Sequence, residues 1–252
     1  MSTASPREIL IACVERLLAG CRHIAVGASS PIPAAGAMLL RARREREGGE
    51  PVRLSILGSV EHNVFTNGGV ELFDCAAQGR IDAFFLGGGQ IDGQGNINLV
   101  GTGHYPTTDV RWPGSFGSSF MAAIVPRVIL FREEHSPRVF VEKVDFVSAT
   151  GTSAPGIYRT GGPVALLTSR AVFSFDRDRA RFRLESLHPG HSLEEVASAT
   201  GFTFDHDARP ATTPPPDAQT LALLRGPVLD DLAETYPDFA DRLRREPQAA
   251  AA

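Results

Sequence analysis

The sequence has few of the features that define several large classes of protein. It contains 3 cysteines, Cys13, Cys21 and Cys75, with no CxxC spacing, which argues against a disulfide framework and against a zinc site. No uninterrupted apolar run approaches the roughly 20 residues that a membrane span needs. The formal net charge is −4, so the chain has no summed positive field to hold nucleic acid or an anionic membrane. A small molecule or another protein is the expected partner.

The composition is that of an ordinary globular protein. Of the 252 residues, 42% are hydrophobic and 21% are charged, enough to bury a substantial core. We expect one domain over residues 1–245 and a frayed tail over residues 246–252. Glu8 and Glu15 interrupt the first apolar stretch, which a secretory signal would not allow, so we expect a cytoplasmic location.

Hydrophobic periodicity in the first third of the chain alternates between helix and strand. Ser5 and Pro6 open a helix that ends near Gly20, and Ser30 and Pro31 open a second helix. The alternation predicts an α/β fold with an open, mainly parallel sheet. The predicted strands are 22–27, 52–57 and 81–86, the predicted helices between them are 31–41 and 70–76, and 43–49 is a predicted charged connector.

Further elements are predicted in the rest of the chain. The strands 164–167 and 171–175 are close enough to form a hairpin. Ser192 and Glu195 have the spacing of a capping box and predict a short helix that ends at Gly201. Other predicted elements are strands at 128–131, 139–141 and 144–147 and a final helix around 221–224.

A glycine-rich loop follows the third predicted strand. Five glycines lie within ten residues of its end, and ligands of open parallel sheets bind at that edge. The alternative is a structural crossover with a tight turn at Asp92 and Gly93, and composition alone leaves both open. A second glycine and serine loop follows at 113–119, which suggests a shared cleft. The candidate substrate-binding or CoA-binding residues are Gly87, Gly88, Gly89, Gln90, Asn96, Arg111, Gly114, Ser115 and Gly117.

Four blocks of sequence carry a family resemblance. They are GGGQIDGQGNINLVG, RWPGSFGSS, RVFVEKVDFVSATG and SLHPGHSLEEVASATGF, and they fall in order across roughly residues 8 to 230. In these blocks the chain resembles the β subunit of glutaconate CoA-transferase and its relatives. The resemblance implies the open α/β fold of the class I CoA-transferase superfamily, an active site shared with an α subunit in an α2β2 assembly, and a coenzyme A thioester as substrate with no other cofactor and no metal.

The chain departs from this family at its catalytic position. The resemblance places the family glutamate at the end of the second predicted strand, where this sequence has Leu57. A leucine cannot attack a thioester to form the covalent intermediates of the transferase reaction. Glu61, His62 and His104 are the remaining weak catalytic candidates in the chain, and no residue of this chain is assigned a certain catalytic role.

Another relative also lacks that glutamate, and its reaction does not require one in the β subunit. The chain also resembles the β subunit of the bacterial steroid ring-cleaving hydrolase, in which water attacks a ring ketone while the CoA thioester stays intact. We therefore expect the β subunit of a cytoplasmic hydrolase that opens a cyclic keto acyl-CoA by carbon–carbon cleavage. The alternatives are a CoA-transferase for glutaconate or a 3-oxoacid, and a non-catalytic subunit that completes its partner's site.

Overall fold

The computed structural model describes residues 4–66 and 69–246. These residues form two compact units. Unit 1 contains residues 4–66, 81–85 and 214–246, and unit 2 contains residues 69–80 and 86–213. The single domain over residues 1–245 stays a prediction, and residues 247–252 of the predicted tail lie outside the described residues.

The centre of unit 1 is a parallel sheet in the order β3-β1-β2. Every residue of β1 and β3 is buried, as expected for strands that are covered on both faces. The predicted parallel arrangement is therefore confirmed. The strands are β1 (His23–Val26), β2 (Arg53–Ile56) and β3 (Ala83–Leu86).

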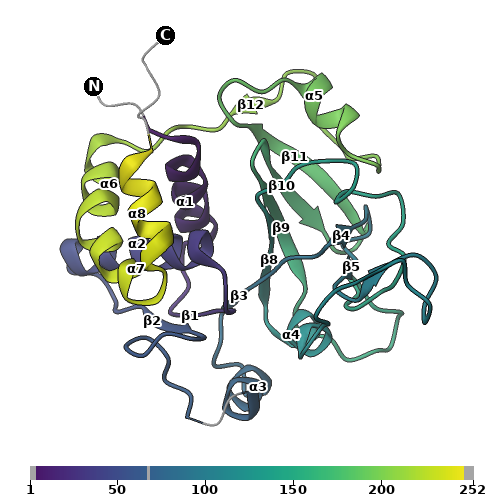
Figure 1. The fold of residues 1–252 in the computed structure, drawn as a ribbon, viewed down its shortest axis with the longest axis horizontal. Helices are drawn as coiled ribbons and strands as arrows, with labels where there is room; N and C mark the ends of the chain where they lie inside the picture. Colours follow the sequence, from purple (N-terminus) through teal and green to yellow (C-terminus); the bar gives the residue numbers. More distant parts are fainter. Residues whose placement is uncertain (1–3, 67–68, 247–252) are drawn as a thin grey trace. The chain divides into compact units, whose positions relative to one another are not determined.

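Helices from both ends of the chain gather in unit 1 (Figure 1). The predicted start of α1 at Ser5 and Pro6 is confirmed, and Ser5 and Glu8 also cap each other's backbone there. The Arg7 guanidinium lies 5.9 Å from the ring centroid of Phe239, which places α8 beside α1. The helices are α1 (Pro6–Leu17), α2 (Pro31–Glu47), α6 (Ala218–Leu223), a π-helical turn (Leu224–Val228), α7 (Leu229–Thr235) and α8 (Pro237–Arg245).

The predicted connector at 43–49 is wrong over most of its length. Helix α2 continues to Glu47 and ends at Gly48 in the left-handed conformation. The charged residues stay helical because they find partners on neighbouring helices. Arg43 donates to Glu15 and to Thr220, each at 2.8 Å.

Unit 2 is built on a mixed sheet in the order β12-β11-β10-β9-β8. The predicted hairpin is confirmed by the antiparallel pairing of β9 and β10, while β8 and β9 run parallel. Strand β11 was missed. The strands are β8 (Arg127–Arg132), β9 (Pro163–Thr168), β10 (Ala171–Asp176), β11 (Arg181–Leu187) and β12 (Ala211–Thr212).

The predictions of strands at 139–141 and 144–147 are wrong. Residues 139–141 form one isolated bridge, in which Ile91 N donates to Val139 O at 2.7 Å and Val141 N donates to Ile91 O at 3.0 Å. Val139 N donates instead to Ser136 O in a turn, at 3.0 Å. The capping box of Ser192 and Glu195 is present, but its helix ends at Ser198.

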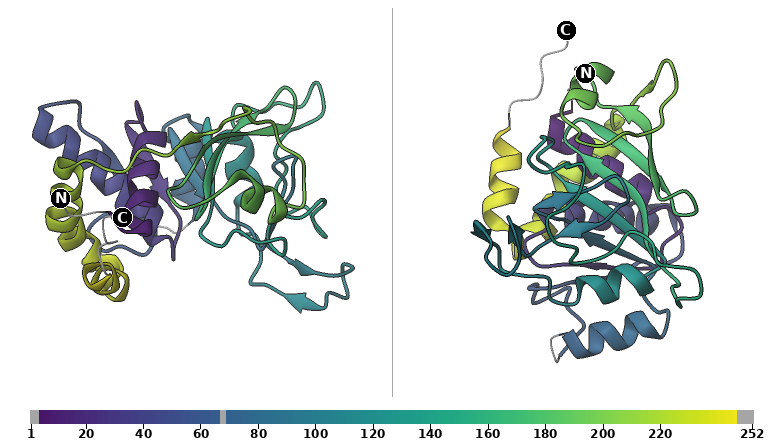
Figure 2. Two further views of the ribbon diagram at one scale, coloured as in Figure 1. Left: turned by 90° about the horizontal axis from the view of Figure 1, so that it is seen from above. Right: turned by 90° about the vertical axis from the view of Figure 1, so that its right-hand side faces the viewer.

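The remaining elements of unit 2 are short. Helices α3 and α4 lie side by side, as the right-hand view of Figure 2 shows, and Phe73 of α3 packs 5.6 Å from Phe120 of α4. Among the described residues, none of the helices combines the length and apolar character that a bilayer crossing requires. The short elements are α3 (Gly69–Ala77), α4 (Ser118–Ile124), α5 (Leu193–Ser198), β4 (Gln90–Ile91), β5 (Ile97–Asn98), β6 (Gly101–Thr102) and β7 (Val110–Arg111).

Candidate functional site

The ends of β1 and β2 open onto a groove in unit 1. Val26 and Ile56 are register partners, and Leu57 N donates to Val26 O at 2.9 Å, so the loops after both strands leave the sheet together. This is the edge where open parallel sheets bind ligands. The groove has a volume of about 480 Å³ and is lined by these loops and by the start of α8. Its lining includes Ser29, Leu57, Gly58, Tyr236, Phe239 and Arg242.

Leu57 faces this groove, at the position where the family resemblance expects a glutamate. The end of β2 therefore supplies an apolar side chain instead of a nucleophile. Among the described residues that line the groove, the carboxylate is that of Asp238, which comes from α8. The chemistry of the groove is thus set by apolar walls and by polar groups of the C-terminal helices.

The loop that carries Leu57 is closed by its own backbone. Ile56 N donates to His62 O at 2.9 Å, and Ser59 N donates to Ile56 O at 3.1 Å. Gly58 has a φ of +94°, a conformation that other residues rarely adopt. A glycine is needed at this turn, which directs the chain from the groove to the side of α7.

Glu234, near the end of α7, fixes the same loop. Its two carboxylate oxygens accept hydrogen bonds from Val60 N and Ser59 Oγ, each at 2.7 Å. Burial raises the pKa of the Glu234 carboxyl, but hydrogen bonds from Thr235, Ser59 and the loop backbone outweigh this and lower the pKa to about 2. Glu234 is therefore an ionised anchor for the loop at neutral pH.

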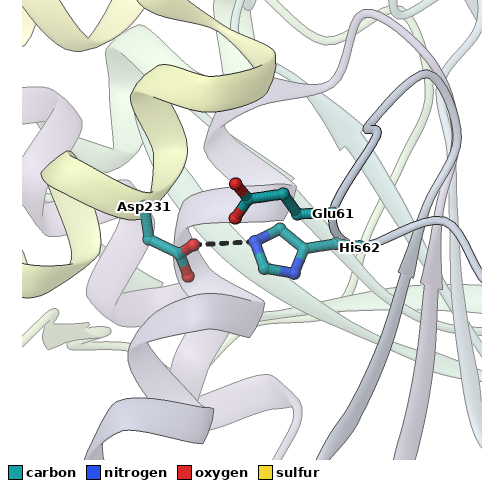
Figure 3. A group of neighbouring side chains, drawn as sticks. All are labelled: Glu61, His62 and Asp231. Atoms are coloured by element: carbon teal, nitrogen blue, oxygen red, sulfur yellow. Dashed lines mark hydrogen bonds and ion pairs between the residues drawn. The ribbon is translucent and has the colours of Figure 1, made fainter.

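Glu61, His62 and Asp231 lie together between the same loop and α7 (Figure 3). His62 Nε2 lies 2.7 Å from Asp231 Oδ1, and the second carboxylate oxygen of Asp231 accepts from Arg41. One ligand atom from each of the three lies within 4.8 Å of the others, and imidazole and carboxylate groups are ligands for zinc. Asp231 is nevertheless already paired with two groups. The cluster therefore acts as a hydrogen-bonded link between the loop, α7 and α2.

Glu61 and His62 do not line the groove at Leu57. Carrying Glu61 into the place of Leu57 would require the loop to release its bonds from Ser59 and Val60 to Glu234. The catalytic roles of Glu61 and His62 stay predictions, and the observed contacts of His62 give it a positioning role.

In unit 2 the predicted glycine-rich loop folds as the hairpin β4–β5. Asp92 Oδ1 accepts from the backbone N–H of Gln94 and Asn96 at 3.0 and 3.1 Å, which forms the tight turn of the structural alternative. Asn96 Oδ1 accepts in turn from Gly151 N at 3.1 Å. Asn96 is thus committed to contacts within its own unit.

The glycines of this loop allow other atoms of the protein to pack closely against its backbone. A Cβ added at Gly89 would lie 2.2 Å from the Trp112 ring, and one at Gly88 would lie 2.5 Å from Gln90 O. A Cβ at Gly87 would lie 2.9 Å from the backbone oxygen of Phe131. These distances account for the glycines by packing. The binding roles of Gly87, Gly88 and Gly89 stay predictions.

Gln90 is held in a hydrogen-bonded network. Its Oε1 accepts from Asn98 Nδ2 at 2.8 Å and from Asp145 N at 2.9 Å, and its Nε2 donates to Asp145 Oδ2 at 3.1 Å. Asp145 also accepts from Gly103 N at 2.9 Å. His104 lines an open hollow of about 470 Å³ beside this network. A catalytic role of His104, which stays a prediction, would require the substrate to bind in this hollow of unit 2.

The second predicted loop forms the start of α4. Gly117 has a φ of +66°, and a Cβ there would lie 2.3 Å from the Phe73 ring. Ser115 O accepts from both the backbone and the side chain of Ser118 at 2.9 Å. Gly114 also has a positive φ, of +114°. Glycine at these positions is explained by backbone conformation and packing.

Arg111 also has a partner within its unit. Its Nη1 donates to Val100 O at 3.1 Å. The structure thus brings Leu57, Glu61 and His62 to one loop of unit 1 and places the glycine loops, Arg111 and His104 in unit 2.

Sequence reasoning missed the polar residues of the C-terminal helices. Asp231, Glu234 and Tyr236 contact the loops after β1 and β2, yet they match no local motif. Their partners lie about 170 or more positions away in the chain. The sequence gives one weak signal of this region, because Tyr236 and Pro237 mark a helix boundary inside a segment that is otherwise amphipathic.

The fold and groove define an open-sheet α/β protein with its candidate site at the carboxyl ends of parallel strands. The family model described as coenzyme A transferase matches residues 51–199, more than half of the chain. The chain belongs to the coenzyme A transferase family, as its sequence blocks predict.

Individual relatives agree with this family. The chain is 33% identical over 153 residues to one subunit of 3-oxoadipate CoA-transferase from Pseudomonas knackmussii, and this match spans only 58% of each chain. It is 29% identical over 231 residues to the cholesterol ring-cleaving hydrolase IpdB subunit of Rhodococcus jostii, covering 87% of this chain and 90% of that one. A chain in the crystal structure of Rhodococcus jostii IpdAB has a TM-score of 0.74 at 25% identity and covers 88% of this chain and 94% of its own length.

Proposed function

We propose that this chain is the β subunit of a two-subunit hydrolase that opens a cyclic keto acyl-CoA by carbon–carbon bond cleavage. The observation that supports this most is Leu57 in the groove at the end of β2. A transferase reaction needs a carboxylate nucleophile at that point. Hydrolysis of a ring ketone needs water instead. The similarity over 87% of the chain to a ring-cleaving hydrolase subunit also supports the proposal.

The proposed reaction leaves the thioester intact. The oxygen of water bonds to the ring ketone carbon, and the bond from that carbon to its neighbour breaks. The ketone carbon becomes a carboxylic acid, and the released carbon takes up a proton. This chain would supply the groove and its loops, while an α subunit would supply the acid and base groups. We further propose an α2β2 assembly, a cytoplasmic location and no cofactor beyond the coenzyme A of the substrate.

The second candidate is a CoA-transferase for a dicarboxylate or 3-oxoacid. It is favoured by the 33% identity to a 3-oxoadipate CoA-transferase subunit. In that reaction coenzyme A leaves one acyl group and joins another. The position of Leu57 argues against it, because Asp238 would have to replace a nucleophile at the end of β2.

The fate of coenzyme A distinguishes these candidates. The full chain would be isolated with any subunit that copurifies and incubated with cyclic keto acyl-CoA esters in water enriched in ¹⁸O. The hydrolase proposal expects a ring-opened acyl-CoA with one ¹⁸O in a new carboxyl group and no free coenzyme A. Transfer of coenzyme A to an added dicarboxylate would contradict it. Full activity of this chain as a single protein would contradict the two-subunit proposal.

A further inference from the structure

A tyrosine at the junction of α7 and α8 faces the groove that contains Leu57. We propose that Tyr236 donates a hydrogen bond to a carbonyl oxygen of the acyl group bound there, an inference that rests on the proposed function. The ligand class is a thioester or ketone oxygen, and the step requires no bond to be made or broken by the tyrosine.

The position of Tyr236 is fixed by two helices. Its backbone N–H donates to Leu232 O at 2.9 Å and ends α7, while its carbonyl accepts from Phe239 N and Ala240 N at 3.1 and 3.0 Å and starts α8. These bonds fix the backbone of Tyr236, and the hydroxyl contact with Ser30 N restrains the ring. Tyr236 is therefore pre-organised on the groove wall.

Its hydroxyl group lies at the start of α2. The oxygen accepts from Ser30 N at 3.3 Å, and the residues on both sides, Ser29 and Pro31, line the groove. This contact uses a lone pair of the hydroxyl and leaves its proton available. Among the described residues, none accepts that proton in a hydrogen bond. An N–H donated to a hydroxyl oxygen also polarises the O–H bond, which makes it a better donor.

The hydroxyl stays protonated at neutral pH. Burial raises the pKa of Tyr236, the N–H of Ser30 opposes this, and the negative charge of Glu234 adds to the increase. The group is therefore a neutral donor across the physiological range. A neutral donor suits a carbonyl oxygen, which carries only partial negative charge before the reaction.

The rest of the groove favours the same ligand. Leu57 and Phe239 supply apolar surface, against which a hydrogen bond to an acyl carbonyl is stronger than in water. Asp238 and Arg242 also line the groove, and a glutamate at position 57 would add a second carboxylate, whereas the leucine leaves an apolar wall for a neutral acyl group. Apolar surface together with a fixed neutral donor matches an acyl carbonyl.

The test uses Tyr236→Phe, which removes only the hydroxyl, and Tyr158→Phe as a matched control. Tyr158 lies in unit 2 and is 80% exposed. The full chain with any copurifying subunit would be titrated with acetoacetyl-CoA and 3-oxoadipyl-CoA labelled with ¹³C at both carbonyls. Isotope-edited infrared spectra of the bound thioesters would then report hydrogen bonding to each carbonyl directly.

The proposal expects one labelled carbonyl band to move to higher frequency in Tyr236→Phe and affinity to fall roughly 2- to 10-fold, at an unchanged melting temperature. The control should match the parent protein. Unchanged bands and affinity in Tyr236→Phe would overturn the role of Tyr236 alone. Failure of the parent protein to bind either thioester would also overturn this inference, whereas the proposed function is tested separately by the fate of coenzyme A in the ring-opening experiment.

Discussion

The Ser59 hydroxyl donates to a Glu234 carboxylate oxygen at 2.7 Å, although the two residues lie 175 positions apart in the chain. This bond joins the loop after β2 to the end of α7. The groove at Leu57 is bordered by that loop and by the segment that follows Glu234. The shape of the candidate site therefore depends on contacts between the first quarter of the chain and its C-terminal helices.

Replacing Glu234 by glutamine should destabilise the protein in a pH-dependent way. The folded pKa is about 2 and the ordinary value is 4.5, so the contribution of the ionised carboxylate is complete above pH 4.5 and is lost as the pH falls from 4.5 through 2. At pH 7 the variant should lose about 1.5–3 kcal/mol of unfolding free energy, the usual value for a hydrogen bond to a charged group.

Thermal denaturation followed by circular dichroism would measure this effect. The difference in melting temperature between the parent and Glu234→Gln should shrink below pH 4.5. Asp230→Asn is a control on the same helix, because the Asp230 side chain is 76% exposed. Its effect should be small at every pH. An equal loss for Glu234→Gln at pH 7 and pH 3 would show that the charge of Glu234 does not anchor the loop.

Gly89 and Trp112 should be energetically coupled. A side chain at position 89 collides with the Trp112 ring, so Gly89→Ala should cost about 1–3 kcal/mol in the parent protein. The same substitution should cost much less in a Trp112→Ala background. A double-mutant cycle by chemical denaturation measures the difference. Gly27→Ala is a control, because no heavy atom lies within 4 Å of its added Cβ. Additive effects would count against the packing explanation.

The 2.2 Å distance from an added Cβ at Gly89 to the Trp112 ring also decides how the glycine loop can be tested. Loss of turnover in Gly89→Val would not by itself show a binding role, because the substitution also disturbs the packing against Trp112.

His135 should make unit 2 sensitive to mild acid. It is 5% exposed, and its ring nitrogens lie 2.8 and 3.0 Å from the hydroxyls of Thr168 and Thr200. Burial lowers the pKa of His135 to about 4, and the positive charges of Arg170 and of two nearby histidines, His191 and His188, act in the same direction.

The folded state therefore resists protonation of His135, whereas the unfolded chain accepts a proton near pH 6.5. The stability that the neutral ring provides is complete above pH 6.5 and is lost as the pH falls from 6.5 towards 4. The melting temperature of the parent should fall over this range, and His135→Gln should show a flatter dependence. His206→Gln, at an exposed histidine, should follow the parent. Parallel curves for parent and His135→Gln would contradict this.

Local signals in the sequence predict much of the fold. The capping box of Ser5 and Glu8 marks the start of α1, and the run of buried apolar residues at 81–86 marks a strand of the parallel sheet. Strand β11 could also have been found, because Phe182 and Leu184 alternate with Arg181 and Arg183. These features depend on neighbours in the sequence, which a periodicity records.

The candidate site depends on contacts that no local pattern records. Arg43 lies in a charged run that resembles a connector until Glu15 and Thr220 are seen beside it. Glu234 likewise lies in a segment whose composition is typical of an exposed helix, and only the structure shows that the loop at Ser59 packs against it. The family resemblance identifies Leu57 as a departure from the family. Only the structure shows that Leu57 and Tyr236 line the same groove.

The most direct test of the account is whether this chain forms a covalent adduct with substrate coenzyme A. The full chain, with any copurifying subunit, would be incubated with an acyl-CoA, trapped with borohydride, digested and analysed by peptide mass spectrometry. Because Leu57 occupies the nucleophile position, every peptide of this chain should keep its unmodified mass while the acyl-CoA is consumed. A modified peptide containing Glu61 or Asp238 would contradict the account and return the chain to the covalent transferase mechanism.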